Sequence, residues 1–582
     1  MFSMVIISTY IPPRVVDNYL SIYPLACTIG LSVLLVCFLS FTGSNTIKLG
    51  FADLLLTIIV CYYLCRYNYV ERLADWKIYY AILLLIFWFT ARIILSNYLG
   101  SKRNLIIVII IMGCLQVIWG IFQLYELLPS YNEFYAITGS FYNPGPYTGY
   151  VGMFIPLCVY QILNTYKKEK CFWIGILALL ICIIPAGMSR IAWIAIIVGI
   201  IFVFMTYFKL FLKLRLLYKN NRLLFIFYSF VFMFICFVIL YQLFIMRPMS
   251  VYGRLFIWKI TLFAILKQAL WGYGPGSFPY IYGKEQSSYF SSVDYSWLEE
   301  SVAGAPEYAF NEYLQFLIEG GVILFLLIIA FIIYCFRVGI KRKQYGVCAS
   351  LLTFCLFAFA SYPMQVLAFG PIVIIFIAVL VSKYEHIEGQ SQKKRKSYLY
   401  ILLLLLLVVS IPTIYILRKS ISVKRDIVSA QQMCAVELYE DGINLVSRNY
   451  SKIFHNPYML QNYAFMYIKR REYSKAIKIL NRAEKVGCSP NILYLKAFCY
   501  EKIRDVVRAE LTYKEAINRI PIKLYPYYML TKLYSKYYYN DKNRVIEMAQ
   551  IALNKKLKKE SVAGNEMKEE IHQILDRYVK TK

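Results

Sequence analysis

The sequence is poor in charged side chains and especially poor in acidic ones. Only 16% of its 582 residues are charged, and 33 Asp and Glu stand against 63 Lys and Arg. A soluble globular domain carries about a quarter charged residues, whereas 60% of this chain is hydrophobic. The apolar residues gather in runs long enough to cross a bilayer, which takes about 20 helical residues. These runs continue to residue 417, so an ordinary soluble protein is excluded.

Histidine and the common catalytic motifs are also scarce. The three histidines, His386, His455 and His572, all lie outside the apolar runs. The sequence has no P-loop, dinucleotide fingerprint, HExxH pair or nucleophile elbow. Its 15 cysteines are scattered without a CxxC or Cys/His ligand spacing, so neither a metal nor a cofactor is predicted. Residues 2–12 lack a basic flank, and no cleavable signal peptide is expected.

The net charge of +30 comes largely from short connections between apolar runs and from the C-terminal region. Short basic loops mark the cytoplasmic side of a membrane protein. We therefore predict a role in topology and no nucleic-acid partner. The five basic connections that face this side are Lys102-Arg103, Lys167 to Lys170, Lys209 to Arg222, Arg337 to Lys343, and Lys393 to Lys396.

The apolar pattern predicts an all-α, polytopic membrane protein of about 12 transmembrane helices. The basic loops then place residues 125–146, the long loop 247–314 and the tail on the extracytoplasmic side. Within the long loop, residues 256–271 predict an amphipathic interfacial helix. The predicted spans are 20–42, 50–66, 78–96, 104–124, 147–165, 171–188, 190–208, 223–246, 315–336, 345–361, 364–382 and 398–417.

The tail, residues 418–582, is predicted to be a second domain after a membrane domain of residues 1–417. Its sequence repeats with a period of 33, and a third unit follows from Tyr525 to Leu553. This period resembles tetratricopeptide repeats, although the Trp and Gly of that pattern are missing. Stacked helix pairs present a concave surface, which serves either as a structural cap or assembly scaffold or as a recognition site for an acceptor or partner protein. The repeated pairs are Pro457/Pro490, Ala464/Ala497, Tyr467/Tyr500 and Ala476/Ala509.

Two motif clusters open spans on the predicted extracytoplasmic side. The first, GSFYNPGPYTGY from Gly139 to Tyr150, combines a rigid Gly/Pro turn with aromatics and Asn143, which suit a sugar. An interfacial turn in an aromatic belt explains the same residues. The second is Met188-Ser189-Arg190. Arg190 either snorkels to water or pairs with a phosphate through its planar guanidinium.

Two more clusters belong to the long loop and the span that follows it. Gly253-Arg254 and Trp258 precede GYGPGSF, residues 272–278, whose backbone N–H groups are candidates for holding an anion. In EYAFNEYLQFLIEGG, residues 307–321, Glu312 and Glu319 are seven residues apart and share a helix face. Ionisable groups that enter a membrane are functional-site candidates.

These motifs, in this order and on one side, resemble the O-antigen ligase-related family. That family includes lipopolysaccharide O-antigen ligases, O-antigen polymerases and protein O-oligosaccharyltransferases. The resemblance covers most of residues 20–417, and the chain looks most like variants that carry a C-terminal tetratricopeptide domain. The ordered set is SFYNPGPYTGY, Ser-Arg at a span start, Gly-Arg with a Trp four residues later, GYGPGSF, and NEYLQF opening the next span.

The resemblance implies a metal-independent, inverting glycosyltransferase of the bacterial inner membrane that uses no cofactor. Such an enzyme moves a glycan from an undecaprenyl diphosphate carrier to an acceptor hydroxyl in the periplasm. The acceptor is the lipid A core, a growing polysaccharide or a protein. Arg190 and Arg254 match the two essential arginines of the family, which hold the departing diphosphate. The implied partners are the lipid-linked glycan, an acceptor glycolipid or protein, and membrane lipids.

One position departs from the family pattern. The family's general-base histidine precedes an Asn, and here Phe310 precedes Asn311. Because a phenylalanine takes no proton, Glu307 or Glu312 acts as the base, or leaving-group stabilisation suffices, or the chain is divergent. The sequence leaves these alternatives open. The side chains expected to contact the sugars are Tyr142, Asn143, Tyr147, Tyr273, Asn311 and Gln315.

Two other classes of function compete with a glycosyltransferase. A polysaccharide transporter or flippase is expected to show internal symmetry and charges near mid-membrane, and the sequence shows neither. A membrane-anchored scaffold that acts through its repeats would leave the ordered loop motifs unexplained. The glycosyltransferase is therefore the leading hypothesis.

Overall fold

The computed structural model describes residues 2–8, 18–42, 45–98, 100–383, 390–536, 539, 541–558 and 561–580. Within them every regular element is helical and no strand is present, which confirms the predicted all-α class. His386 lies outside the described residues, and so do the side chains of the basic residues Lys393, Lys394 and Arg395.

Each predicted span corresponds to a helix or to a broken helix. Seven helices of the described residues are long and apolar enough to cross a membrane, and shorter apolar helices accompany them. The chain is thus a polytopic membrane protein. The helices are α3 (Tyr23–Thr42), α4 (Phe51–Cys65), α5 (Asp75–Asn97), α6 (Ser101–Leu124), α7 (Pro144–Gly152) with α8 (Ile155–Asn164), α9 (Lys167–Cys182), α10 (Arg190–Tyr207), α12 (Arg222–Ile245), α16 (Glu312–Lys341), α17 (Tyr345–Phe359), α18 (Phe369–Val381) and α19 (Gln390–Ala435).

The predicted span 147–165 is two helices in the structure. The first, α7, begins at Pro144 beyond its N-cap Asn143, and it ends before α8 begins at Ile155. Pro156 at the start of α8 has no N–H to continue the ladder of α7. The prolines therefore explain both the early start and the break.

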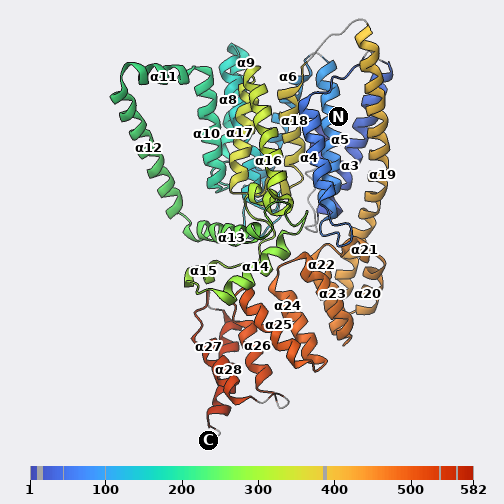
Figure 1. The fold of residues 1–582 in the computed structure, drawn as a ribbon, viewed down its shortest axis with the longest axis vertical. Helices are drawn as coiled ribbons and strands as arrows, with labels where there is room; N and C mark the ends of the chain where they lie inside the picture. The colour runs from blue at the N-terminus through green and yellow to red at the C-terminus, as the bar shows by residue number, and fades with distance from the viewer. Residues whose placement is uncertain are drawn as a thin grey trace.

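The basic connections meet at one end of the bundle. Lys102 donates to the carbonyl of Ser382 at 2.5 Å, and Arg342 donates to the same oxygen at 2.9 Å. Arg103 pairs with Glu169 at 3.2 Å. Helix α11 (Leu210–Asn220), which carries further basic residues, lies across the same end (Figure 1). The long loop and the tail lie at the opposite end (Figure 1).

The long loop is folded into helices. It contains α13 (Pro248–Lys267), α14 (Phe278–Ser292) and α15 (Trp297–Val302). Helix α13 runs crosswise between the bundle and the tail (Figure 1), although its length and composition would also allow a span. It begins eight residues before the predicted start at 256, because Pro248 occupies its first turn, and it ends at Lys267 instead of 271.

The tail consists of helices whose starts follow the sequence repeat. Helices α22 and α24 begin at Pro457 and Pro490, and α23 and α25 begin at Tyr473 and Val506. The tetratricopeptide assignment itself stays a prediction. The proposed domain boundary at 417/418 falls inside α19. The tail helices are α20 (Tyr439–Arg448), α21 (Tyr450–Ile453), α22 (Pro457–Lys469), α23 (Tyr473–Val486), α24 (Pro490–Lys502), α25 (Val506–Arg519), α26 (Tyr525–Tyr534), α27 (Lys542–Asn554) and α28 (Val562–Lys580).

Ionic contacts fix the tail to the membrane body. Arg482 and Lys485 of α23 both pair with Glu71, in the connection between α4 and α5, at 2.8 and 2.7 Å. The hydrogen bond from Lys485 holds the pKa of the Glu71 carboxyl below its usual range. Lys555 pairs with Glu300 of α15 at 2.6 Å. The repeats therefore sit directly under the loop that carries the candidate site.

The separation of the two ends predicts a sidedness that can be measured. We expect a cysteine introduced at exposed Ser291 to react with an impermeant maleimide in intact spheroplasts, in a background without exposed native cysteines. A cysteine at exposed Arg215 of α11 should react only after lysis, since basic loops stay cytoplasmic. Protection of position 291 in intact spheroplasts would contradict the layout.

Candidate functional site

Arg190 begins α10 at the tail-facing end of the bundle. Its half-buried guanidinium donates to the carbonyl of Arg247 at 3.4 Å, and Arg247 donates to the sulfur of Met188 at 3.3 Å. Met188 itself has a left-handed backbone, with φ 46°. The positive charges of Arg190 and Arg247 repel each other, and so do those of Arg190 and Arg254. The two predicted arginines therefore belong to one cationic cluster.

Arg254 lies on α13, and its guanidinium sits 6.0 Å from the ring centre of Phe310. Four residues on, the indole of Trp258 donates to the carbonyl of Ala309 at 3.1 Å. Positions four apart share a helix face, so one face of α13 covers the segment before α16. Arg254 is half-buried and forms no ion pair with an acidic side chain in the part of the chain that the structure describes.

The segment around Phe310 is held rigidly. Phe310 has a left-handed backbone with φ 51°, and Asn311 caps α16 by accepting from the N–H groups of Tyr313 and Leu314 at 2.9 and 3.2 Å. The amide oxygen of Gln315 accepts from the N–H of Ala309 at 2.9 Å. Asn311 and Gln315, both predicted to contact sugars, are buried; Asn311 bonds backbone N–H groups, and Gln315 bonds the backbone and the Glu319 side chain. They fix the place where Arg254 rests.

The glycine-rich loop 272–278 packs on a break in α16. The N–H groups of Tyr273 and Gly274 donate to the carbonyls of Ile318 and Glu319, both at 2.8 Å. Gly272 and Gly321 both have positive φ, and their backbones touch. Two of the N–H groups considered for an anion are thus occupied. Tyr273 turns its hydroxyl to the carbonyl of Ala264 at 3.0 Å.

Glu307 faces the tail. It accepts a hydrogen bond from the hydroxyl of Tyr458, and its charge also acts on Tyr362. The charge of Arg254 acts on Tyr362 as well, so this phenol lies in the electrostatic field of both Glu307 and Arg254. Its ring packs against Phe310 and Tyr308 at centroid distances of 5.1 and 5.2 Å. The rings of Tyr362 and Phe310 thus lie between the Glu307 carboxylate and the Arg254 guanidinium.

Glu312, the second predicted carboxylate, is bonded to the segment that follows Tyr362. It is 2% exposed, and its two oxygens accept from the N–H of Met364 at 2.7 Å and the amide of Gln365 at 3.1 Å. Those residues belong to the short helix η2 (Pro363–Gln365), which follows Tyr362. Glu312 therefore positions the turn that carries Tyr362. Both of its oxygens already accept protein hydrogen bonds.

The residues of the first motif, Gly139 to Tyr150, have two different environments. Tyr142 is 53% exposed, and Asn143 caps α7 by accepting from the N–H of Gly145 at 2.8 Å. Tyr147 is completely buried, and its hydroxyl donates to the carbonyl of Gln116 at 3.0 Å. Its ring fills the space beside Gly120 and Gly139. Tyr147 thus packs the bundle and does not reach the site.

A cavity of about 720 Å³ gathers part of the predicted set between bundle and tail. It holds Tyr142, Asn143, Glu307 and Gln315 from the sequence prediction. The lining omits Tyr147, Tyr273, Asn311, Glu312 and the two arginines, although Tyr362 connects the cavity to Arg254. Tail residues complete the wall, among them Tyr458 and Cys488.

Sequence reasoning missed three residues of this region: Arg247, Tyr362 and Tyr458. Arg247 precedes the helix-starting Pro248, so its position was readable from the chain. Tyr362 precedes Pro363 in a connection that the predicted layout already placed on the extracytoplasmic side. No local signal marks Tyr458, because its contact with Glu307 depends on how the tail docks.

Residues 175–329 match the O-antigen ligase family, which confirms the resemblance that the motifs indicated. The match runs from α9 into α16, and it contains Arg190, Arg254, Glu307 and Asn311. A search of curated proteins finds no match to the chain. The tail lies outside the matched residues, so its class remains untested.

The docking of the glycine loop predicts a large effect of a small substitution. In Gly272→Ala the new Cβ would lie 2.6 Å from the backbone nitrogen of Gly321, at a φ of 65°. Strain of this kind costs about 1–3 kcal/mol, and we expect a clearly lower melting temperature of the purified protein. Gly175→Ala, with open space around its Cβ, is the matched control and should melt as wild type. Equal melting of both variants would contradict the docking role.

Proposed function

We propose, on the premise that residues 175–329 match the O-antigen ligase family, that this protein is a membrane glycosyltransferase. It moves a glycan from an undecaprenyl diphosphate carrier to an acceptor hydroxyl on the extracytoplasmic face of the bacterial inner membrane. The observation that carries the proposal is Arg254, a half-buried cation beside Arg190 and without an acidic partner among the described residues. A desolvated cation of this kind favours an anionic ligand.

The arginine cluster suits a diphosphate. Two guanidinium groups offer planar, paired donors that match phosphate oxygens. When the bond between the sugar and the diphosphate breaks, negative charge grows on the departing oxygen. Cations that are already in place stabilise this charge without rearranging at the moment of reaction. The ring of Phe310 supports Arg254 from one side and leaves its donors to the ligand.

The surroundings of the cluster suit a lipid carrier. Helix α12 stands at the edge of the bundle and leads into α13 (Figure 1). Its apolar side chains are largely exposed, with Leu223 at 81%, Phe230 at 66% and Phe237 at 66%. In a bilayer such a surface faces acyl chains. An isoprenoid chain can therefore lie in the lipid while its diphosphate reaches Arg254.

The acceptor approaches from the cavity side. Its hydroxyl oxygen attacks the anomeric carbon of the donor sugar, and the bond from that carbon to the diphosphate oxygen breaks. The hydroxyl proton goes to the Glu307 carboxylate, which lines the cavity and lies near Tyr362. We assign the base role to Glu307, since both oxygens of Glu312 already accept hydrogen bonds. Acceptors compatible with this chemistry are a glycolipid core, a growing polysaccharide and a protein hydroxyl.

Phe310, at the position of the family histidine, has a different role in this protein. Phe310 supports Arg254 and packs against Tyr362, so it shapes the site without moving a proton. The acid–base work shifts to a carboxylate three residues earlier in the chain. Position 310 thus keeps an aromatic ring, and the proposed base, Glu307, lies closer to the tail.

The arginines should be indispensable. We expect Arg190→Ala and Arg254→Ala each to lower transfer from an undecaprenyl diphosphate-linked glycan by at least about 100-fold, the scale of removing one transition-state donor. Lysine should restore little, because it replaces a planar fork with a point charge. The readout is product formation by purified protein at matched levels, with exposed Arg215→Ala as the control. Full activity of both alanine variants would refute the diphosphate clamp.

The two carboxylates should behave differently. Glu307→Gln keeps the shape and removes the base, so transfer should fall about 100-fold while the melting temperature stays near wild type. Glu312→Gln disturbs the acceptor of Met364 and Gln365, and it should lower the melting temperature more than the transfer rate. Unchanged transfer in Glu307→Gln would show that this carboxylate is not the base.

A further inference from the structure

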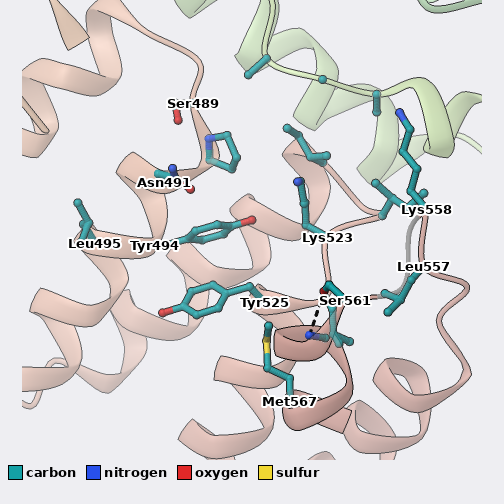
Figure 2. A pocket seen from close by; sticks show the side chains of 18 of the residues that line it. Ser489, Asn491, Tyr494, Leu495, Lys523, Tyr525, Leu557, Lys558, Ser561 and Met567 are labelled. Carbon is teal, nitrogen blue, oxygen red and sulfur yellow. Dashed lines mark hydrogen bonds between the residues drawn. The ribbon is translucent and has the colours of Figure 1, made fainter. Parts of the chain in front are cut away.

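A second and larger cavity lies under the membrane body. Its volume is about 1220 Å³, and its walls come from the tail repeats and from the segment 301–305 that ends α15. Figure 2 shows the tail side of this cavity, with Tyr494 and Tyr525 side by side and the hydroxyl of Tyr494 on the side of Lys523. The cavity is distinct from the arginine cluster, which contributes none of its lining.

The repeat itself builds the cavity wall. Gln461 and Asn462 of α22 line it, and so do Tyr494 and Leu495, which stand 33 positions later on α24. The period of 33 thus brings equivalent helix faces to one surface. Tyr458, which contacts Glu307, is likewise 33 positions before the lining residue Asn491. Equivalent positions of the two repeats therefore line the cavity, at Asn491, and contact the candidate base, at Tyr458.

The cavity combines aliphatic side chains with aromatic, amide and cationic ones. The rings of Tyr494 and Tyr525 lie 4.8 Å apart between centroids, and the Tyr494 hydroxyl is buried without a hydrogen-bond partner in the described structure. Lys523 and Lys558 are exposed to the cavity and pair with no acidic side chain of the described residues. Among the residues that the structure describes, the lining contains no Asp or Glu. The amide side chains at the cavity are Gln461, Asn462 and Asn491.

The larger cavity adjoins the smaller one. Ala305, Gln461 and Ser489 line both. In the chain, only Pro306 separates Ala305 from Glu307. A ligand that extends from the larger cavity into the smaller one therefore passes from the tyrosine pair to the predicted base without leaving the protein surface.

We propose that this cavity binds an acidic glycan chain, which it presents to Glu307 as the acceptor. Aromatic faces pack against the apolar faces of sugar rings, amides both donate to and accept from hydroxyls, and lysines pair with carboxylates. The two lysines, in a lining without an acidic side chain among the described residues, favour an anionic ligand over a basic one. Binding of the glycan is independent of the glycosyltransferase assignment, whereas its role as acceptor rests on that proposed function.

Binding can be tested with the full-length protein in detergent and a fluorescent heptameric oligogalacturonate as the probe. We expect saturable binding that Lys523→Glu weakens about tenfold or more, the scale of losing one charge-assisted contact. Tyr494→Ala combined with Tyr525→Ala should weaken it similarly. Lys523 is exposed, so its substitution leaves folding intact. Lys478→Glu, an exposed residue of α23 outside the cavity, makes the same charge change and should alter affinity less than twofold.

Two other probes define the ligand class. Maltoheptaose and a hexaglutamate peptide should bind at least tenfold more weakly than oligogalacturonate. Equal binding of maltoheptaose would overturn the acidic class, and tighter binding of the peptide would assign the cavity to a protein partner. Absence of saturable binding, or an equal loss in Lys478→Glu, would overturn the site. Arg254→Ala should retain full glycan binding, so a failure of the diphosphate proposal is distinguishable from a failure of this one.

Discussion

The break in α16 at Gly321 constrains everything at the tail-facing end of the bundle. With φ 69° and ψ −174°, Gly321 interrupts the helical ladder and frees backbone groups in apolar surroundings. Unpaired backbone groups are costly there, and the loop before α14 satisfies them. The N–H of Val322 donates to the carbonyl of Ala269 at 2.9 Å, and the preceding carbonyls of α16 accept from the glycine loop. Helices α13 and α14 are thereby tied to a span, which sets where Arg254 can stand.

The cationic side chains of the bundle fall into two groups: some form ion pairs with buried carboxylates, and others do not. Arg92 pairs with Asp53 at 3.0 Å, and Lys77 pairs with Glu319, each within the buried bundle. Buried charges are stable in this way only with close partners. Arg254 and Arg247 have no such partner among the described residues. Glu319 is already held by Lys77 and Gln315, whereas Arg254 forms no ion pair with an acidic side chain of the described residues.

Sequence patterns predicted most of the fold, because apolar length and a repeat period are local properties. They located most spans within a few residues, and they located the helix pairs of the tail. Helix α19, from Gln390 to Ala435, extends well beyond the predicted span 398–417, and the span 147–165 is two helices. The patterns also placed Arg190 and Arg254 at the same end. They erred on side-chain direction: Tyr147 turned inward, and Glu312 turned to a short helix that is remote in sequence. Such outcomes depend on contacts between distant segments, as does the pairing of Glu307 with Tyr458 across the docked tail.

The docking of the tail has a consequence for the acceptor path. Gln286 of α14 donates to the carbonyl of Arg519, and Cys488 donates to the carbonyl of Pro306 at 3.3 Å. The repeats therefore hold the residue beside Glu307 directly. Ala305 of the same segment lines the tail cavity. Because Ala305, Pro306 and Glu307 are consecutive, the tail cavity and the docked repeats both border the segment that carries the Glu307 carboxylate. The repeats thus hold the segment of Glu307 through Cys488 and Tyr458, next to the residue that we propose as the base.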